Sequence, residues 1–226
     1  MDDLYSIVDK YFLHIDNEEN SLPGIFYYED LSNIIKTSIR ERKNLGFNEF
    51  SSIVGVKYNS RILHFTKIIL KKNERAFTIN KIIDCIRRRL MNLYYGVFAE
   101  AILEGMYYRS KKFKVISLTD EDDYENRIDL RIQNLKGQTL DIQVKSISHL
   151  VKPTEYQKYK LFLEQEIHSK ANNPVIYAYF NHNFEDRYFI IDGLKLNIFG
   201  YGLSNIKDLD YFTQKIFNKR FTLEAD

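Results

Sequence analysis

The sequence predicts a mixed α/β (α+β) fold behind a helical N-terminal part. Apolar residues recur at helical spacing through much of the first 108 residues. Short segments between residues 113 and 191 then alternate apolar and polar residues, as strands with one buried face do. From residue 81 the predicted order is helix, three strands, helix, two strands, helix, which is typical of a sheet covered by helices. We therefore expect a helical domain over residues 1–80 and a mixed α/β domain over residues 81–226.

The composition of the 226 residues excludes several classes of protein. Hydrophobic residues make up 44% and charged residues 28%, which excludes a disordered or fibrous chain. No run of about 18 apolar residues occurs, so no membrane span is expected. The acidic start, Met1–Tyr5, lacks the basic region of a signal peptide. The single cysteine, Cys85, leaves no disulfide framework and no thiolate zinc site. We expect a cytoplasmic protein.

The N-terminal part is predicted to begin with two helices and to continue into a helix-turn-helix. Apolar spacing predicts helices over Leu4–Ile15 and Glu29–Lys43. Residues 50–63 then have the rhythm of two helices joined at Gly55, with Val56 turned inward. The second helix would expose four residues near its N-terminus, where repressor helices reach the bases in a major groove: Lys57, Tyr58, Asn59 and Arg61. Plain packing of two helices joined at a glycine is the alternative.

The remaining elements follow from a change of period after a long helix. That helix is predicted from Lys81 to about Tyr108. Beyond it we expect a strand over 113–118, a loop over 120–125, two hairpin strands within 127–146, a helix over 154–170, strands over 175–180 and 187–191, and a helix over 204–219 capped by Ser204.

The net charge of +2 hides an asymmetry along the chain. Residues 1–35 hold one base and eight acids, residues 36–89 hold fourteen bases and four acids, and residues 90–226 hold eighteen bases and nineteen acids. A basic middle segment in a near-neutral chain indicates contact with the phosphates of a nucleic acid. A solvated helical surface with an acidic neighbour is the alternative. The acidic first 35 residues are either a docking surface or an arm that packs on the basic segment.

Residues 127–146 predict a β-hairpin with one polar face. If the pairing is symmetric about Lys136, Asp129 lies opposite Gln143, with Cβ atoms about 5 Å apart. Lys145 points to the same side, so one face collects a carboxylate, an amide and an amine. Mg²⁺ prefers oxygen ligands, and a nearby ammonium can orient a water or stabilise charge developing on phosphorus. This face suits phosphodiester cleavage, while an ordinary polar face turned to solvent is the alternative.

These residues resemble the PD-(D/E)xK nuclease superfamily over residues 86–192. The family core is a glutamate-bearing helix, a three-strand meander with Asp on the second strand and (D/E)-x-K on the third, then a helix and a further strand. Gly96–Glu100 resembles the helix motif, and the same helix carries Glu104 one turn further. Asp129 and the segment Gln143–Lys145 take the two strand positions, with two departures. Ile128 stands in place of the usual proline, and Gln143 in place of an acid that Asp141 on the same face could replace.

The resemblance implies a restriction-endonuclease-like mixed sheet flanked by helices and a Mg²⁺-dependent endodeoxyribonuclease, first of all a type II restriction enzyme. Asp129, Gln143 and Glu100 would hold Mg²⁺, which Mn²⁺ can replace, and Lys145 would assist the water. The implied partners are double-stranded DNA and, for a palindromic site, a second copy in a homodimer. Homing, transposon-borne and repair nucleases share this core. The alternative from a different class is a DNA-binding regulator whose nuclease-like domain is inactive.

Overall fold

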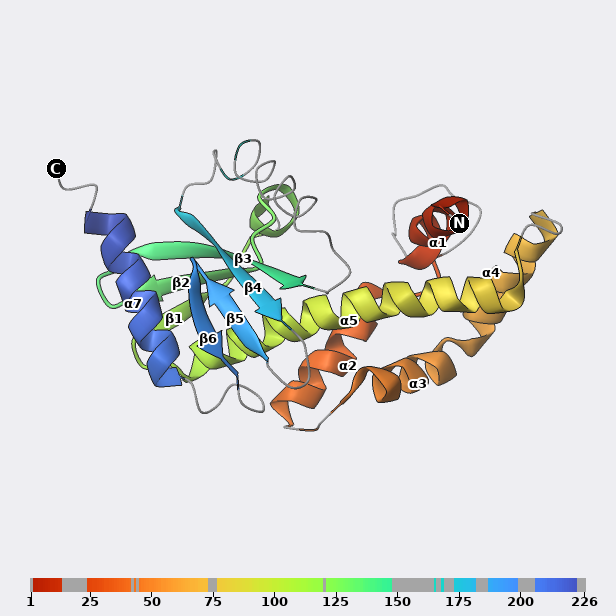
Figure 1. Ribbon diagram of the computed structural model, residues 1–226, viewed down its shortest axis with the longest axis horizontal. Coiled ribbons are helices and arrows are strands. Elements are labelled where there is room, and N and C mark those ends of the chain that lie inside the picture. The colour runs from red at the N-terminus through yellow and green to blue at the C-terminus, as the bar shows by residue number, and fades with distance from the viewer. Residues whose placement is uncertain are drawn as a thin grey trace. The chain divides into compact units, whose positions relative to one another are not determined.

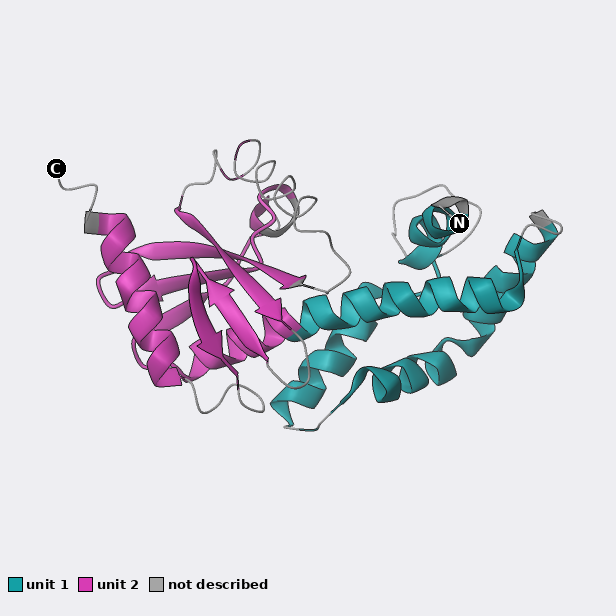
Figure 2. Cartoon of the chain, viewed as in Figure 1, with its two compact units in different colours: residues 1–98 teal, residues 99–226 magenta. Residues whose placement is uncertain are grey.

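The computed structural model divides the chain into two compact units, residues 1–98 and residues 99–226 (Figure 2). The described residues are 2–13, 24–41, 43, 45–72, 77–119, 121–147, 165, 168, 173–181, 187–198 and 206–222. The longest helix contributes residues 79–98 to unit 1 and residues 99–109 to unit 2. None of the helices in this described part combines the length and the apolar character that crossing a bilayer requires.

The described part of unit 1 is mainly helical, as predicted (Figure 1). Its helices are α1 (Asp2–Phe12), α2 (Tyr28–Arg40), α3 (Phe47–Lys57), α4 (Asn59–Lys72) and the first part of α5 (Ile79–Arg109). Aromatic side chains make much of the core. Phe26 is fully buried and its ring centroid lies 5.0 Å from that of Phe12, and Phe50 packs 5.3 Å from Tyr94.

The first helix ends at Phe12 rather than at the predicted Ile15. The carbonyl oxygen of Tyr11 accepts the N–H of Ile25 at 2.8 Å. That of Phe12 accepts the N–H of Phe26 at 3.0 Å. The last carbonyls of a helix have no partner within it, and these bonds from the following segment satisfy two of them.

The predicted turn at Gly55 is wrong. Gly55 lies inside α3, and the two helices are divided by the single residue Tyr58. Phe50, Val54 and Tyr58 are all buried at a spacing of four residues, so one apolar stripe continues past the glycine. Val56, expected to point inward, is 80% exposed. Tyr58 takes the inward position that the pattern assigned to Val56, and a helix-turn-helix of the expected form is not observed.

Unit 2 contains a six-stranded mixed sheet, in agreement with the predicted α/β class. Its strands are β1 (Phe113–Ile116), β2 (Leu130–Asn134), β3 (Thr139–Ile147), β4 (Val175–Asn181), β5 (Tyr188–Ile191) and β6 (Leu194–Asn197). They are hydrogen-bonded in sequence order, and only β3 and β4 are parallel neighbours. The other elements are η1 (Glu121–Glu125), a π-helical segment where a loop was expected, and α7 (Ile206–Thr222).

The predicted register of the hairpin is confirmed. Leu130 pairs with Ile142 and Ile132 pairs with Leu140, which is symmetric about Lys136. Gly137 closes the turn with φ 81°, a conformation that glycine adopts without strain. The predicted helix over 154–170 lies outside the described residues, apart from residues 165 and 168, and so does Ser204.

Strand β6 was not predicted. It follows β5 through a two-residue turn, Asp192–Gly193, in which both residues have positive φ (47° and 84°). An Asp-Gly pair between two apolar segments is typical of such a turn, so the signal is present in the sequence. The carboxylate of Asp192 also contacts Arg220 of α7 at 3.3 Å, which attaches the turn to that helix.

The apolar face of the sheet packs against α5 and α7. Phe113 of β1 lies on this face, with its ring stacked on Phe217 of α7 at 5.5 Å and against Tyr107 of α5 at 6.2 Å. The Tyr107 hydroxyl is hydrogen-bonded to Thr213 at 2.9 Å. The opposite face carries the polar residues of the hairpin.

We expect Gly55→Ala to stabilise unit 1 by about 0.5–1 kcal/mol, because alanine favours a helix interior and no atom lies within 4 Å of the added Cβ. Gly137→Ala is the reference of opposite sign, since its φ of 81° should make the change destabilising by about 1–2 kcal/mol. Urea unfolding of each variant measures both effects. A loss of stability in Gly55→Ala would instead indicate the turn that the sequence suggested.

Candidate functional site

The polar face of the hairpin brings Asp129 and Gln143 into direct contact. Asp129 lies immediately before β2, and its backbone N–H donates to the carbonyl of Ile142 at 3.1 Å. Its carboxylate oxygen Oδ2 accepts the N–H of Val144 at 2.6 Å and also a hydrogen bond from Nε2 of Gln143. The side chain of Asp129 thus accepts a hydrogen bond from the backbone of β3, next to the backbone bonds that join β2 and β3.

Gln143 is 1% exposed, and its Oε1 has no hydrogen-bond partner in the part of the chain that the structure describes. The carboxylate of Asp129 accepts from Nε2, which turns Oε1 the other way. A buried acceptor without a donor costs about 1–3 kcal/mol. Oxygen is also the ligand atom that Mg²⁺ and Mn²⁺ take from amides and carboxylates. The site thus presents one unsatisfied oxygen beside a carboxylate.

The polar face around this pair is buried, which contradicts the alternative of a face turned to solvent. Arg131 of β2 contacts Asp141 of β3 through Nε at 2.6 Å and Nη2 at 2.9 Å. The same guanidinium contacts Asp122 of η1 at 2.7 Å and 2.9 Å. The side chain of Arg131 is 17% exposed and that of Asp141 is 2% exposed. Segment η1 therefore covers this part of the sheet.

Asp141 was expected to be able to replace the missing acid at position 143, and the structure gives it another role. Its Oδ1 and Oδ2 both accept hydrogen bonds from Arg131, and Oδ2 also accepts one from Asn173 at 3.2 Å. These contacts satisfy the carboxylate within a buried ion triad of Asp122, Arg131 and Asp141. Asp141 is a structural residue of the sheet here.

The contacts between Asp122 and Arg131 and their neighbours shift the pKa of these two residues. Burial by itself would raise the pKa of Asp122, but hydrogen bonds from Arg131 and from the backbone and hydroxyl of Thr119 outweigh it and hold the pKa below its ordinary value. The hydrogen bond to Asp141 raises the pKa of Arg131, with further bonds to Asp122 acting against the effect of burial. Asp122 and Arg131 are therefore both charged at neutral pH.

Sequence reasoning missed His168 and two tyrosines of β4. Tyr177 lies beside Gln143 in the β3–β4 register, and Tyr179 lies beside Lys145. The two tyrosine rings stack at 6.1 Å, and burial raises the pKa of Tyr179. The alternation of tyrosines with other residues in 175–181 could have predicted that both tyrosines lie on the same face of β4.

His168 joins β4 to the segment that leads into Asp129. Its Nε2 lies 3.1 Å from the carbonyl oxygen of Asn126, which can only accept, so Nε2 carries the proton. Its Nδ1 therefore accepts the hydroxyl of Tyr177 at 2.6 Å. The imidazole thus bridges two elements that border the candidate site.

The other two predicted catalytic residues lie on the expected elements. Lys145 is half-buried and follows Gln143 by two residues on the same face of β3. Glu100 is half-buried on α5, within unit 2. Among the described residues, no group of three or more His, Cys, Asp or Glu side chains is arranged to hold a metal ion. The predicted ligand set differs from such a group because one of its members is an amide.

The four predicted DNA-contacting residues are mostly engaged within unit 1. Tyr58 is 4% exposed and donates to Asp30 at 2.5 Å, and Lys57 pairs with the same carboxylate at 2.7 Å. Arg61 donates to the hydroxyl of Tyr27 at 2.7 Å and lies over its ring. Of the four, Asn59 is exposed at the start of α4 and makes no such contact with the residues that the structure describes. The prediction that Tyr58 is exposed is wrong.

These contacts also shift two pKa values. Hydrogen bonds from Lys57 and Tyr58 hold the pKa of Asp30 below its ordinary value. Burial, with the hydrogen bond to Asp30, raises the pKa of Tyr58 to about 12. The phenol is therefore a neutral hydrogen-bond donor within unit 1 at physiological pH.

Two of the acidic N-terminal residues pair with the basic segment, in the way that the alternative of a packed arm expects. Asp9 of α1 pairs with Arg89 of α5 at 2.6 Å, and Tyr5 accepts a hydrogen bond from Arg88 at 2.7 Å. Asp30 of α2 pairs with Lys57 in the same way. Part of the basic charge is thereby compensated within unit 1.

We expect Asp122→Asn to lower the free energy of unfolding by about 1.5–3 kcal/mol at neutral pH, because it removes charge-assisted hydrogen bonds to Arg131. The pKa of Asp122 is depressed in the folded state, so its contribution is full above about pH 4 and is lost as pH falls through the folded-state pKa. The difference in free energy of unfolding between wild type and variant should therefore disappear in acid. Urea unfolding at several pH values measures it.

Glu121→Gln is the matched control, since it removes the same charge from an exposed position of η1. It should leave the acid dependence of the wild type nearly unchanged. An equal effect of both variants would mean that net charge, rather than the ion triad, sets the acid stability.

Comparison of the chain with protein-family models, with curated proteins and with solved structures gave no match. Any assignment of function therefore rests on the chemistry and geometry of the chain itself.

Proposed function

We propose that this chain is a metal-dependent endonuclease that hydrolyses phosphodiester bonds in double-stranded DNA, in the first instance as a type II restriction enzyme. The observation that carries the proposal is the buried, unsatisfied Oε1 of Gln143 beside the carboxylate of Asp129. A divalent cation that takes both oxygens would require the amide of Gln143 to turn Oε1 toward the carboxylate, in place of the present bond from Nε2. The residues present thus fit Mg²⁺ or Mn²⁺, which both take oxygen ligands.

The order of elements in unit 2 supports the proposal. A helix, α5, is followed by three antiparallel strands, and the fourth strand, β4, is the parallel neighbour of the third. These described elements agree with the order expected for the core of the PD-(D/E)xK family, whose helix between the third strand and the next falls outside the described residues. Asp129 enters the second strand and Gln143–Lys145 lies on the third, as that pattern requires.

The roles of the residues follow from their chemistry. Asp129 and Gln143 would hold the cation, with Glu100 on α5 as a third oxygen donor. A bound Mg²⁺ polarises a phosphoryl oxygen and lowers the pKa of a bound water. Lys145 would orient the attacking water and stabilise the negative charge that develops on the phosphate. The water oxygen loses a proton to solvent and bonds to phosphorus as the bond to one deoxyribose oxygen breaks, and that leaving oxygen takes up a proton from solvent.

Cleavage of both strands at a palindrome would favour a two-fold homodimer, which we include in the proposal. The same core would serve a homing, transposon-borne or repair nuclease.

One observation favours a second candidate, a DNA-binding regulator with an inactive nuclease-like domain. The amide of Gln143 donates to Asp129, and Val144 donates to the same oxygen. The carboxylate is therefore partly satisfied without a cation. Two acids in these positions would instead repel each other in the absence of metal.

We expect the purified protein to cut plasmid DNA with Mg²⁺, and Lys145→Ala to lower the rate by about 10²–10³-fold, because the variant no longer stabilises charge at phosphorus. Asp129→Asn should lower it at least as far. Gel analysis of timed digests measures both effects.

Lys136→Ala is the matched control, since Lys136 is an exposed lysine at the turn of the same hairpin. It should cut like the wild type. Binding of DNA without cutting under both Mg²⁺ and Mn²⁺ would contradict the enzyme and support the regulator.

We expect Gln143→Glu to change the response to metal. Without metal the variant should melt at a lower temperature than the wild type, because the amide donor to Asp129 becomes a second carboxylate. Addition of Mn²⁺ should then raise its melting temperature by more than that of the wild type, since ligand binding to the folded state stabilises it. Thermal unfolding with and without metal measures this.

Gln133→Glu on β2 is the control, because it makes the same change where the amide bonds only to the carbonyl of Gly137 at the turn. An equal response to Mn²⁺ in both variants would contradict a cation site at Gln143.

A further inference from the structure

The outward side of α4 carries uncompensated positive charge. The helix has 14 residues, Asn59–Lys72, and none of them is acidic. Phe65, Thr66 and Ile69 form its buried side. Four exposed residues recur at a helical spacing on the opposite side, and we name them the outer stripe: Ser60, His64, Lys67 and Lys71.

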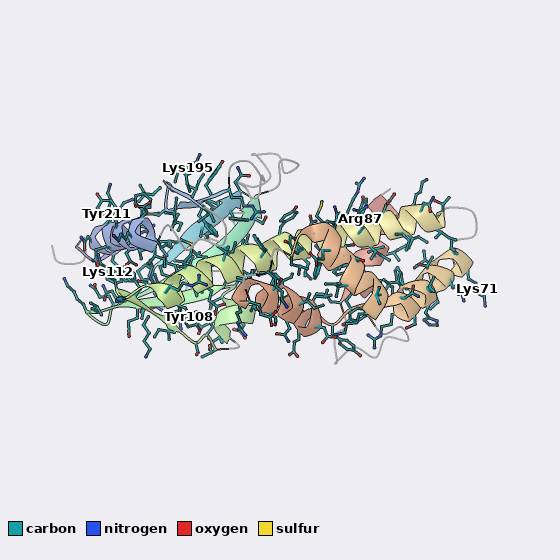
Figure 3. The ribbon with its side chains drawn as sticks, turned by 90° about the horizontal axis from the view of Figure 1, so that it is seen from below. Lys71, Arg87, Tyr108, Lys112, Lys195 and Tyr211 are labelled. Carbon is teal, nitrogen blue, oxygen red and sulfur yellow. The ribbon has the colours of Figure 1, made fainter. Side chains whose placement is uncertain are left out.

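The outer stripe runs along most of the helix. At 1.5 Å per residue it spans about 16 Å from Ser60 to Lys71. Lys67 and Lys71 lie one turn apart, with Cβ atoms about 6 Å from each other. Figure 3 shows the side chain of Lys71 extending outward from α4.

The stripe differs from the other basic groups of unit 1. Lys57 pairs with Asp30, Arg89 pairs with Asp9, and Lys43 pairs with Glu41. In contrast, His64, Lys67 and Lys71 make no ion pair within the part of the chain that the structure describes. The acids of the N-terminal helices compensate other basic groups and leave this face of α4 positive.

We propose that the outer stripe of α4 binds the phosphate backbone of double-stranded DNA. The inference rests on the proposed function, from which it takes double-stranded DNA as the class of substrate. Its contact surface is the outer stripe, in place of the predicted contacts Lys57, Tyr58 and Arg61. Lysine and serine donate to phosphate oxygens, whereas the stripe holds no Arg, Asn or Gln, the usual bidentate readers of bases. The contact is therefore independent of DNA sequence.

The residue types favour DNA over an acidic protein. One apolar side chain, Leu63, is 51% exposed on the same side of α4, and a single such residue does not make the apolar centre that a protein interface buries. Two lysines with Cβ atoms about 6 Å apart are close enough to contact neighbouring phosphates of one strand of B-DNA. Each lysine that neutralises a phosphate releases condensed counterions.

The test measures DNA binding in EDTA, so that it does not depend on metal or cleavage. Fluorescence anisotropy follows the binding of two labelled duplexes of about 30 base pairs with unrelated sequences, over a range of salt concentrations. Lys67→Gln/Lys71→Gln should weaken both duplexes alike. The slope of log K against log salt should become shallower by about 1.8, at about 0.9 for each phosphate that a lysine no longer neutralises.

Lys207→Gln/Lys215→Gln is the matched control, because it removes the same charge from exposed lysines of another helix, α7. It should leave the salt slope unchanged. Circular dichroism and melting temperature establish that both double variants are folded.

Three outcomes would overturn the proposal: no binding of either duplex by the wild type, an equal change of slope in both double variants, or weakening of only one duplex. The outcomes for the enzyme are separate. Salt-dependent binding without cleavage under Mg²⁺ would refute the endonuclease and keep the stripe. Cleavage that the stripe variant leaves unchanged, with an unchanged salt slope, would refute the stripe and keep the enzyme.

Discussion

The arrangement of unit 2 depends on one buried cation. The guanidinium of Arg131 lies between Asp122 and Asp141 on the polar face of the sheet. A charge that is removed from water in this way is stable only when its donors are matched by opposite charge. Because Asp122 belongs to η1 and Asp141 to β3, matching Arg131 places η1 over a face that strand alternation alone would leave in solvent. The polar residues of the candidate site therefore lie on a covered face.

The same triad explains the composition of the candidate site. Asp141 is bound to Arg131, so Asp129 is the carboxylate that remains beside Gln143. An amide at position 143 stabilises the observed geometry, because it donates to Asp129 where a second acid would repel it. Its buried Oε1 still lacks a donor in the described part of the chain. The amide of Gln143 thus has two effects: its Nε2 binds Asp129, and its Oε1 is left without a donor among the described residues.

In unit 1, some basic residues are paired with acids and others are exposed without an acidic partner among the described residues. The acids of α1 and α2 pair with basic groups of α3 and α5, as Asp9 does with Arg89 and Asp30 with Lys57. A basic segment identified from the sequence is thereby divided into residues that hold the helices together and residues that face outward. Since Lys67 and Lys71 belong to the second group, the density of positive charge along the chain does not by itself locate a phosphate-binding surface.

The sequence alone determined the elements whose evidence is local. The period-two pattern of the hairpin excludes a one-residue shift, and the short turn centred on Lys136 then predicts the register in which Asp129 lies opposite Gln143. Only the tertiary structure decided what covers each face. Asp122 and His168 reach the polar face from separate segments, and Tyr58 rather than Val56 points inward because a buried stripe continues through Gly55. Local patterns record period and charge, whereas burial depends on contacts between residues far apart in the chain, and no local pattern contains them.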